Sequence, residues 1–588
     1  MSALSASIRQ LKTNQRQWEA FTTEGHCAVL APPGSGKTKL LATRLAYDLA
    51  NKIPRPQGAA CITLTNAAAG ELRQRVEDLG VEGRSTLFLG TVHGFALRRV
   101  IEPFAAVVGR PELTKITIAS TRQCTQAYDQ AIAEIFAPGE DTRNVRSTIE
   151  INRQRLASEH DWSLAGEKVP EVARRYEAKL RAQGLHDFLD IVAIAVEFVE
   201  QHTVVRKVLT AEYPHLYVDE YQDLAPGLDR LVRALCFDYT VNSELFAVGD
   251  PDQAVFAFTG TRPELLHDLA RHSQVTPVEL EHNYRCGQEI IRIANLMRRR
   301  GQVLITSNRD GGHVSAVFCP GGLSDQYVQV VNHVRSAQQR GIPLHEIAVI
   351  CPQNRQCEEV ANVLRNSDIQ AFVRETDYRL TTVTAFVEGC AAWATLGREL
   401  SGYRLGDQLR RWRSIVGARW SQADDVALVE LLMGYADQPD TPMEQLVAAL
   451  MAGGLERALE QVSLADDALE MRQMIESLTS GSMRGLTVQQ FAGRARKLDR
   501  VEVTTMTSSK GREFDVVLLI GADEDSIPYY LSHNNPEQLA EDRRKFYVSI
   551  TRARDEVRVF YSGFVVTRYH RVIQKGPSRF LREIGLVS

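Results

Sequence analysis

The stretch that decides the fold is Ala31-Pro32-Pro33-Gly34-Ser35-Gly36-Lys37-Thr38, close to the N-terminus. A short apolar run at 27–30 precedes it, and residues 39–49 after it have the spacing of a helix. Small residues between a strand and a helix let successive backbone N–H groups curl around phosphate oxygens. The stretch therefore predicts a phosphate-binding loop in an α/β protein with a parallel sheet.

The residue types in this loop also predict how a nucleoside triphosphate is held. The ammonium of Lys37 would reach the outer phosphates, and the hydroxyl of Thr38 would bind a magnesium ion. A glycine usually opens the pattern, and Ala31 stands in its place, which is a mild departure. We expect the nucleotide-binding residues of the loop to be Pro33, Gly34, Ser35, Gly36, Lys37, Thr38 and Lys39.

A second motif, Val218-Asp219-Glu220-Tyr221-Gln222-Asp223, follows an apolar run far downstream. Asp219 would hold magnesium through its hydration shell, and Glu220 would orient and deprotonate the attacking water. An Asp-Glu pair on its own is more often a solvated strand end. Together with the loop, the pair predicts ATP hydrolysis, with Lys37, Asp219 and Glu220 catalytic and with Thr38 and Asp219 as metal ligands.

Three further residues are candidates for the same reaction. Gln253 ends the segment Gly249-Asp250-Pro251-Asp252-Gln253, where its amide would donate to a γ-phosphate or to the water and distinguish ATP from ADP. Arg285 and Arg552 would supply the cations that phosphoryl transfer needs. Alone, the segment would be a turn and each arginine a surface residue. The accompanying ATPase motifs are the reason to expect them in the site.

Apolar runs along the chain indicate two parallel sheets, separated by long charged stretches of helical character. The runs lie at 61–64, 216–218, 245–248, 347–350, 516–520 and 557–560. A chain of 588 residues is long enough for about four domains. We expect one α/β domain at 1–95 with 205–280 and another at 281–376 with 496–588. A helical insert would interrupt the first at 96–204, and a reduced helical insert would interrupt the second at 377–495.

Composition excludes several classes of protein. Hydrophobic residues make up 44% and charged residues 24%, which is ordinary for a globular protein, and the net charge of −4 gives no global attraction to nucleic acid. The nine cysteines form no CxxC pair, so we expect reduced thiols in the cytoplasm and no structural metal. No apolar run approaches the length of about 18 residues that a membrane span needs, so we expect no membrane association.

Eight motifs in order, from about residue 11 to 562, resemble those of the superfamily 1A helicases of the UvrD/Rep/PcrA group. The form of the second motif, an aromatic residue and Gln-Asp after Val-Asp-Glu, is more specific than a generic acidic strand end. The eight segments are 11–16, 65–68, 90–95, 185–188, 218–223, 280–285, 508–514 and 541–553.

The resemblance implies two tandem RecA-like P-loop NTPase lobes, with ATP in the cleft between them and single-stranded DNA across their tops. It implies that Gln15 reads the adenine, Tyr284 stacks on the base, Arg285 and Arg552 reach the phosphates, and Glu513 contacts the ribose. It also implies DNA contacts from Thr65, Asn66, His93, Phe188, Phe256, Phe258 and Thr507.

The departures from the family pattern concentrate on the DNA side. Leu64 and Thr507 stand where an aromatic residue and a histidine are usual, and Thr259 stands where an arginine is usual. A lost base–aromatic stack is worth roughly 1–3 kcal/mol, so the grip on DNA should be weaker. The runs Arg298-Arg299-Arg300 and Arg410-Arg411-Trp412-Arg413 are either solvated helix faces or nucleic-acid contacts.

The resemblance favours an ATP-dependent 3′–5′ DNA translocase and helicase acting on single-stranded DNA and single-strand/duplex junctions in repair or recombination. Two alternatives stay open. One is a helicase-like ATPase subunit that works with a nuclease or repair-protein partner in a defence or end-processing complex. The other is an ATP-switched DNA-binding module, although a pure switch would not need Glu220 and both arginines.

Overall fold

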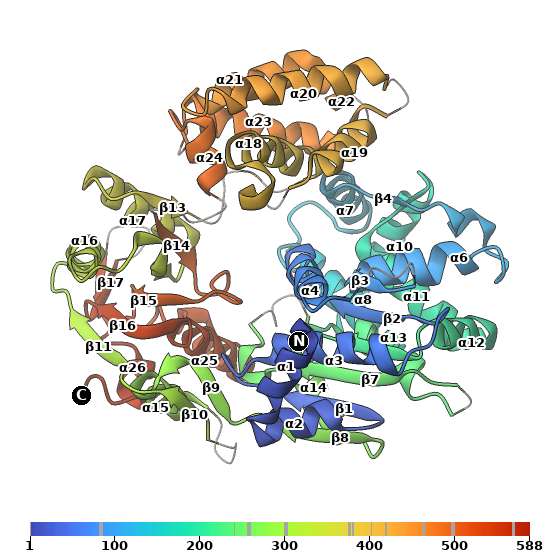
Figure 1. The fold of residues 1–588 in the computed structure, drawn as a ribbon, viewed down its shortest axis with the longest axis horizontal. Coiled ribbons are helices and arrows are strands. Elements are labelled where there is room, and N and C mark those ends of the chain that lie inside the picture. The colour runs from blue at the N-terminus through green and yellow to red at the C-terminus, as the bar shows by residue number, and fades with distance from the viewer. Residues whose placement is uncertain are drawn as a thin grey trace.

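The computed structural model contains two six-stranded sheets and two helical regions above and beside them (Figure 1). The residues that it describes are 2–81, 86–239, 241–255, 260–298, 304–373, 378, 381–401, 403–417, 420–460, 465–481, 483–494, 500–566 and 571–588.

The first sheet has the strand order β3-β2-β6-β7-β1-β8, and all neighbouring strands are parallel. Its strands are β1 (His26–Leu30), β2 (Ala59–Thr63), β3 (Phe88–Thr91), β6 (His215–Val218), β7 (Glu244–Gly249) and β8 (Val275–Glu279). Alternate residues of β1 pack on opposite faces, with Cys27 in one core and Ala28 in the other. Burial on both faces explains why these strands are nearly continuous apolar runs.

Helices cover both faces of this sheet and complete the first lobe. On one face lie α1 (Ala3–Lys12), α2 (Gln15–Thr22), α3 (Lys37–Asn51) and α4 (Asn66–Asp78). On the other lie α11 (Phe188–Gln201), α12 (Thr203–Glu212), α13 (Pro226–Cys236) and α14 (Glu264–Ala270).

The second sheet has the order β11-β16-β15-β12-β14-β13 and is also parallel throughout. Its strands are β11 (His313–Phe318), β12 (Ile347–Cys351), β13 (Ala371–Val373), β14 (Val501–Thr505), β15 (Phe514–Leu519) and β16 (Ala553–Tyr561). One face packs on α15 (Gln288–Met297), α25 (Pro536–Ile550) and α26 (Arg579–Glu583), and the other on α16 (Leu323–Gln339) and α17 (Asn354–Asn366). The predicted α/β class with two parallel-sheet lobes is confirmed.

The chain crosses from the first lobe to the second immediately after β8. Two residues, Leu280 and Glu281, connect β8 to β9 (His282–Gly287), which pairs with β10 (Thr306–Arg309). Strand β9 then leads directly into α15. A small antiparallel hairpin, β17 (Phe564–Val566) with β18 (Val572–Gln574), follows the second sheet.

Helices dominate the segment between β3 and β6. They include α5 (Val92–Phe95), α6 (Glu102–Phe104), α7 (Thr121–Ile135), α8 (Val145–Arg155), α9 (Glu159–Leu164) and α10 (Lys168–Arg181), with the short strands β4 (Thr117–Ile118) and β5 (Leu185–His186). A separate core forms around Tyr128, Ile149 and Tyr176. Helix α11 instead contributes Ile191 and Phe198 to the core of the first sheet. The predicted insert at 96–204 includes α11, although this helix packs with the first lobe. The domain limit at 204 stays a prediction.

A second helical region lies between β13 and β14 and sits above both lobes in Figure 1. Its helices are α18 (Thr382–Ser401), α19 (Leu405–Val416), α20 (Gln422–Ala436), α21 (Met443–Leu450), α22 (Glu456–Leu459), α23 (Ala465–Thr479) and α24 (Val488–Arg494). They enclose their own core, which includes Phe386, Trp412 and Leu446.

Within the described ranges, no helix combines the length and apolar character that crossing a membrane requires. The same residues contain no group of three or more His, Cys, Asp and Glu side chains that could hold a metal ion. All nine cysteines are free thiols, and only Cys124 is not fully buried.

Candidate nucleotide site between the lobes

The phosphate loop joins the end of β1 to the start of α3 at Lys37. Gly34 and Gly36 have φ values of 67° and 81°, a region that side chains other than glycine rarely adopt. A Cβ atom on Gly34 would also lie 2.7 Å from the Cβ of Arg285. Gly34 is therefore required both by the curl of the loop and by the close approach of the second lobe.

The acidic motif lies beside this loop, directly after β6. Lys37 Nζ lies 2.7 Å from Glu220 Oε1, and Asp219 Oδ1 accepts a 3.0 Å hydrogen bond from the backbone N–H of Glu220. Glu220 has a φ of 53°, an unusual backbone conformation for a glutamate. This strained backbone conformation of Glu220 directs its carboxylate towards Lys37.

The two carboxylates of this motif have opposite pKa shifts. Burial and the charge of Glu220 together raise the pKa of Asp219 to about 7. Burial alone would also raise the pKa of Glu220, but Lys37 and Lys510 hold it down at about 2. Glu220 is therefore ionised at neutral pH, whereas Asp219 is a buried carboxyl that a nearby cation would stabilise in its ionised form.

Gln253 belongs to a short turn, η4 (Pro251–Gln253), at the end of β7. Its Nε2 donates to Asp250 Oδ2 at 2.6 Å, and its Oε1 lies 3.4 Å from an Nη2 of Arg552. Lys510 Nζ donates to the Gln253 carbonyl at 2.7 Å and also pairs with Asp223. Sequence reasoning gave Lys510 no role of its own, because its partners come from the other lobe.

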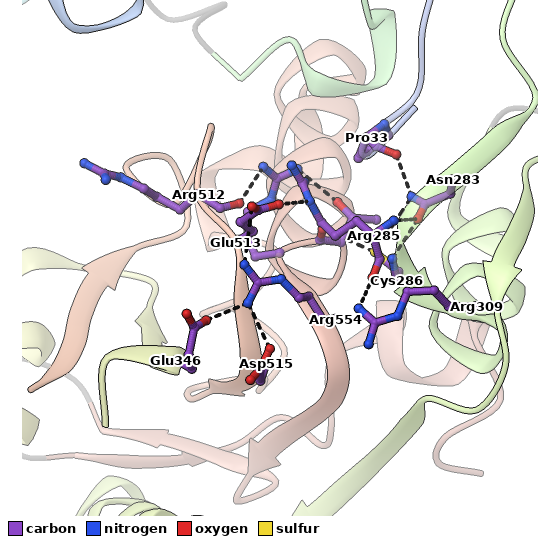
Figure 2. Close-up of polar contacts among 12 residues, drawn as sticks. Pro33, Asn283, Arg285, Cys286, Arg309, Glu346, Arg512, Glu513, Asp515 and Arg554 are labelled. Atoms are coloured by element: carbon purple, nitrogen blue, oxygen red, sulfur yellow. Dashed lines mark hydrogen bonds and ion pairs between the residues drawn. The ribbon is translucent and has the colours of Figure 1, made fainter. Parts of the chain in front are cut away.

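The two arginines predicted to face the phosphates come from the second lobe. Figure 2 shows Arg285 extending from β9 towards Glu513, whose Oε2 lies 2.8 Å from Arg285 Nε. Arg552 is 1% exposed, and its Nε donates to the Val548 carbonyl at 2.9 Å. Burial and the charge of the neighbouring Arg285 together lower the pKa of Arg552 to about 10. Two guanidinium groups held close together make this wall of the site strongly attractive to phosphate.

Strand β9 is hydrogen-bonded directly to the phosphate loop. Asn283 Nδ2 donates to the Pro33 carbonyl at 2.5 Å, and its Oδ1 accepts from the backbone N–H groups of Arg285 and Cys286 (Figure 2). The backbone N–H of Tyr284 donates to the Gly34 carbonyl at 2.8 Å. Asn283 was not among the predicted site residues, because nothing in its spacing indicates which carbonyl it reaches.

The predicted adenine-reading residue Gln15 is exposed at the start of α2. Gln17 is instead buried, and its Nε2 donates to the Ser35 carbonyl at 2.7 Å. Helical spacing was the signal available in the sequence, since Gln17, Ala20 and Phe21 recur at the spacing of a helix and form the buried face of α2. The structure thus brings Gln17, not Gln15, to the phosphate loop.

The remaining loop residues have distinct surroundings. Ser35 is buried, with no hydrogen-bond partner for its Oγ within the described structure. Lys39 Nζ is bonded to Gln10 Oε1 of α1 and so points away from the loop. Thr38 is half-buried in the first turn of α3.

A divalent cation fits the donor set near Lys37. Hydroxyl and carboxylate oxygens are the ligands that magnesium prefers, and Thr38 and Asp219 supply one of each. The raised pKa of Asp219 is the observation that favours a cation, because a positive charge beside a buried carboxyl returns it to its ionised form.

Of the predicted DNA contacts, His93 and Phe188 lie together. Their ring centroids are 5.6 Å apart in an edge-to-face arrangement, and Phe188 is 54% exposed. Leu64, Thr65 and His93 line a cavity of about 220 Å³ next to this pair. The aromatic edge and the cavity form a surface that could receive a base.

The other predicted DNA contacts are less informative. Thr65 caps α4 by accepting from the Ala68 N–H at 3.1 Å, and Asn66 is the first residue of that helix. Thr507 is half-buried in the turn after β14. Phe256 and Phe258 lie outside the described residues, as does Thr259.

The arginine runs do not form a basic groove in the described structure. Arg298 Nε is 3.0 Å from Asp252 Oδ2, so it faces the lobe interface; Arg299 and Arg300 lie outside the described residues. In the second run Trp412 is 2% exposed, and Arg413 is paired with Asp425.

Two models of known protein families match separate segments of the chain. Residues 12–274 match the UvrD/REP helicase N-terminal domain, and residues 455–563 match the UvrD-like helicase C-terminal domain. The chain belongs to the UvrD-like helicase family. The predicted family is thereby confirmed, and the protein is a helicase-family enzyme.

Relatives in this family align with almost the whole chain. "ATP-dependent DNA helicase UvrD2" of Mycobacterium tuberculosis is 25% identical, over 97% of this chain and 81% of that protein. "ATP-dependent DNA helicase PcrA" of Bacillus subtilis is 25% identical, over 97% of this chain and 85% of that protein.

Proposed function

We propose that this UvrD-like protein is an ATP-dependent 3′–5′ DNA translocase and helicase. The observation that carries the proposal is a single polar site made by both lobes. The first lobe supplies Lys37 and Glu220, and the second supplies Arg285 and Arg552. A site divided in this way makes ATP hydrolysis depend on the relative position of the lobes, which is what a motor needs.

The residues have separate tasks in this mechanism. The phosphates of ATP bind at the N-terminus of α3, where their oxygens compete with Glu220 for the Lys37 ammonium. Glu220, ionised at neutral pH, then orients water and accepts its proton. Arg285 and Arg552 stabilise the charge that develops on the transferred phosphoryl group, and Gln253 responds to the terminal phosphate.

Magnesium would be held by Thr38 and Asp219, as the donor set suits. When bound, it supplies positive charge that neutralises the phosphate oxygens. For the nucleoside, we assign the adenine contact to Gln15, with Tyr284 against the base and Glu513 near the ribose. Asn14 Nδ2 donates to the Tyr284 hydroxyl at 2.7 Å, which places α2 beside that ring.

DNA would lie across the carboxyl ends of the strands and contact Thr65, Asn66, His93, Phe188, Phe256, Phe258 and Thr507. The exposed Phe188 next to His93 supports this path. The relatives are named ATP-dependent DNA helicases, which supports DNA as substrate. Polarity and a role in repair or recombination are part of the proposal by family membership. The free thiols suit a cytoplasmic location.

The proposal is tested by measuring ATP hydrolysis with and without single-stranded DNA, on the wild type and on Glu220→Gln. DNA-stimulated turnover that the variant lacks, followed by displacement of strands with 3′ tails but not 5′ tails, would establish the motor. A rate of ATP hydrolysis that single-stranded DNA does not change would instead favour the second candidate, an ATPase subunit that requires a nuclease or repair partner. The departures at Leu64 and Thr507 are the features that favour that candidate.

A further inference from the structure

The turn that carries Gln253 is anchored to the first lobe by Asp250. The backbone N–H of Asp250 donates to Gln222 Oε1 at 2.9 Å, which ties the turn to the acidic motif. Asp250 Oδ1 accepts from the Asp252 N–H at 3.0 Å. These bonds hold the start of the turn at Asp250. The end of the turn, at Gln253 and Ala254, is held by other contacts.

The second lobe grips the outer side of the same turn through the backbone. Lys510 Nζ donates to the Gln253 carbonyl at 2.7 Å, and Arg544 Nε donates to the Ala254 carbonyl at 2.6 Å. Both donors come from motif segments of the second sheet and α25. The turn is therefore held between the lobes and does not belong mechanically to the first lobe alone.

One further contact on this turn joins two side chains. Arg298 Nε lies 3.0 Å from Asp252 Oδ2, and the two side chains are only 13% and 11% exposed. An ion pair shielded in this way is costly to break from one side, because the remaining charge stays buried. Removal of either partner should therefore shift the turn.

Arg298 also has an informative place in the second lobe. It is the C-cap residue of α15, and α15 follows β9, which carries Arg285. A helix of 10 residues is about 15 Å long and is rigid over that distance. The helix thus links Arg285 at one end to the turn of Gln253 at the other.

We propose that Arg298 and Asp252 form a positioning pair that aligns Gln253 with Arg552 for ATP hydrolysis. Arg298 and Asp252 lie outside the phosphate loop, and we infer that the pair acts through the neighbouring Gln253. The inference rests on the proposed ATPase function and adds two residues to it. It also replaces the nucleic-acid contact that the arginine run suggested for Arg298.

A double-mutant cycle on the rate of DNA-stimulated ATP hydrolysis tests the pair. We expect Asp252→Asn and Arg298→Gln each to lower kcat by about tenfold, with the KM for ATP changed by less than about threefold. The double variant should lose about tenfold as well, not the hundredfold of independent residues. Arg298→Lys should recover part of the loss, because it keeps the charge.

The matched control is Arg292→Gln on the same helix. Arg292 pairs with Glu289 in an exposed i,i+3 contact, so its removal should leave kcat within about twofold. Additive losses in the double variant, or single variants that change KM and not kcat, would overturn the positioning role.

Amide hydrogen exchange separates this inference from the proposed function. If the wild type hydrolyses no ATP, the proposed function fails. Arg298→Gln should still raise exchange at both 250–255 and 288–298, since the pair bridges the lobes. Exchange raised on one side only, or on neither, would overturn the bridge.

Discussion

Lys37 Nζ and Glu220 Oε1 are 2.7 Å apart, so the lysine of the phosphate loop and the carboxylate proposed to activate water are ion-pair partners. Phosphate oxygens at the loop would compete with Glu220 for the same ammonium. ATP binding would then free the Glu220 carboxylate from Lys37, so that Glu220 abstracts a proton from water only when ATP is bound.

This relationship predicts a severe effect for Lys37→Ala. The variant should lower kcat for ATP by about 10²–10³-fold, because it removes a preorganised cation from the phosphoryl group. Lys52→Ala, at the other end of α3, is the matched control and should stay within about twofold. Turnover of Lys37→Ala within tenfold of the wild type would contradict the assignment.

Asn283 offers a test of the bond between β9 and the phosphate loop. Asn283→Ala leaves the Pro33 carbonyl and two backbone N–H groups without their partner, a cost of about 1–3 kcal/mol for each buried group left unsatisfied. Asn283→Asp can still accept from the two N–H groups but cannot donate to Pro33. We expect both variants to lose ATP turnover and only the alanine variant to lower the unfolding temperature strongly. Normal turnover in Asn283→Asp would show that this bond is dispensable.

Gln17 and Gln15 can be compared directly. Gln17→Ala should weaken binding of a fluorescent ATP analogue by about tenfold, because it frees the Ser35 carbonyl and loosens the loop. Gln15→Ala leaves this bond in place and removes only the proposed adenine contact, so it should lower the preference for ATP over GTP. An unchanged preference for ATP in Gln15→Ala would contradict Gln15 as the adenine contact.

Asp250 predicts a pH dependence of stability. Burial and the charge of Asp252 together raise its pKa to about 6. For a carboxyl with a raised pKa, the stabilising contribution is complete below the unfolded pKa near 4 and is lost as pH rises through about 6. The unfolding temperature of the wild type relative to Asp250→Asn should therefore fall between about pH 4 and pH 7.

A matched control for this measurement is Asp141→Asn. The hydrogen bond from Arg143 lowers the pKa of Asp141 to about 2, so its contribution is present above about pH 4 and changes only in more acidic solution. The control difference should be flat across the window in which Asp250 titrates. A flat difference for Asp250 as well would contradict its raised pKa.

Phe188 predicts the strength of the DNA contact. Phe188→Ala should weaken binding of single-stranded DNA by roughly 1–3 kcal/mol, the value of one base–aromatic stack. Tyr239 is 97% exposed but lies before the start of β7, at the amino end of that strand and away from the proposed DNA path, so Tyr239→Ala should leave affinity unchanged. Equal affinities for the wild type and Phe188→Ala, measured by fluorescence anisotropy, would remove Phe188 from the DNA path.

The fold was predictable because its determinants are local. The apolar run before Ala31, the glycines at 34 and 36, and the helix that begins at Lys37 all lie within residues 26–51, and short-range sterics dictate their geometry. The order of the motifs then indicated two lobes of one family. The interruption of each sheet by helices also followed from the change to long charged sequence.

The contacts between the lobes were not predictable in the same way. The partner of Arg298 is 46 residues away in sequence, and the partner of Asn283 is a backbone carbonyl 250 residues away. Such pairings depend on how two separately folded sheets meet, which periodicity does not report. The bond from Gln17 to the Ser35 carbonyl was missed for a simpler reason, because the motif pattern does not report which face of α2 is buried.

The two-residue crossing between β8 and β9 lies next to the phosphate loop, since Tyr284 N donates to the Gly34 carbonyl just beyond it. The chain passes from one sheet to the other only there. If one lobe rotates about Leu280 and Glu281, atoms near the phosphates therefore move little, and atoms at the far rims of the sheets move much further. A sub-ångström adjustment around ATP would therefore become a larger displacement at those rims, as movement along a DNA strand requires.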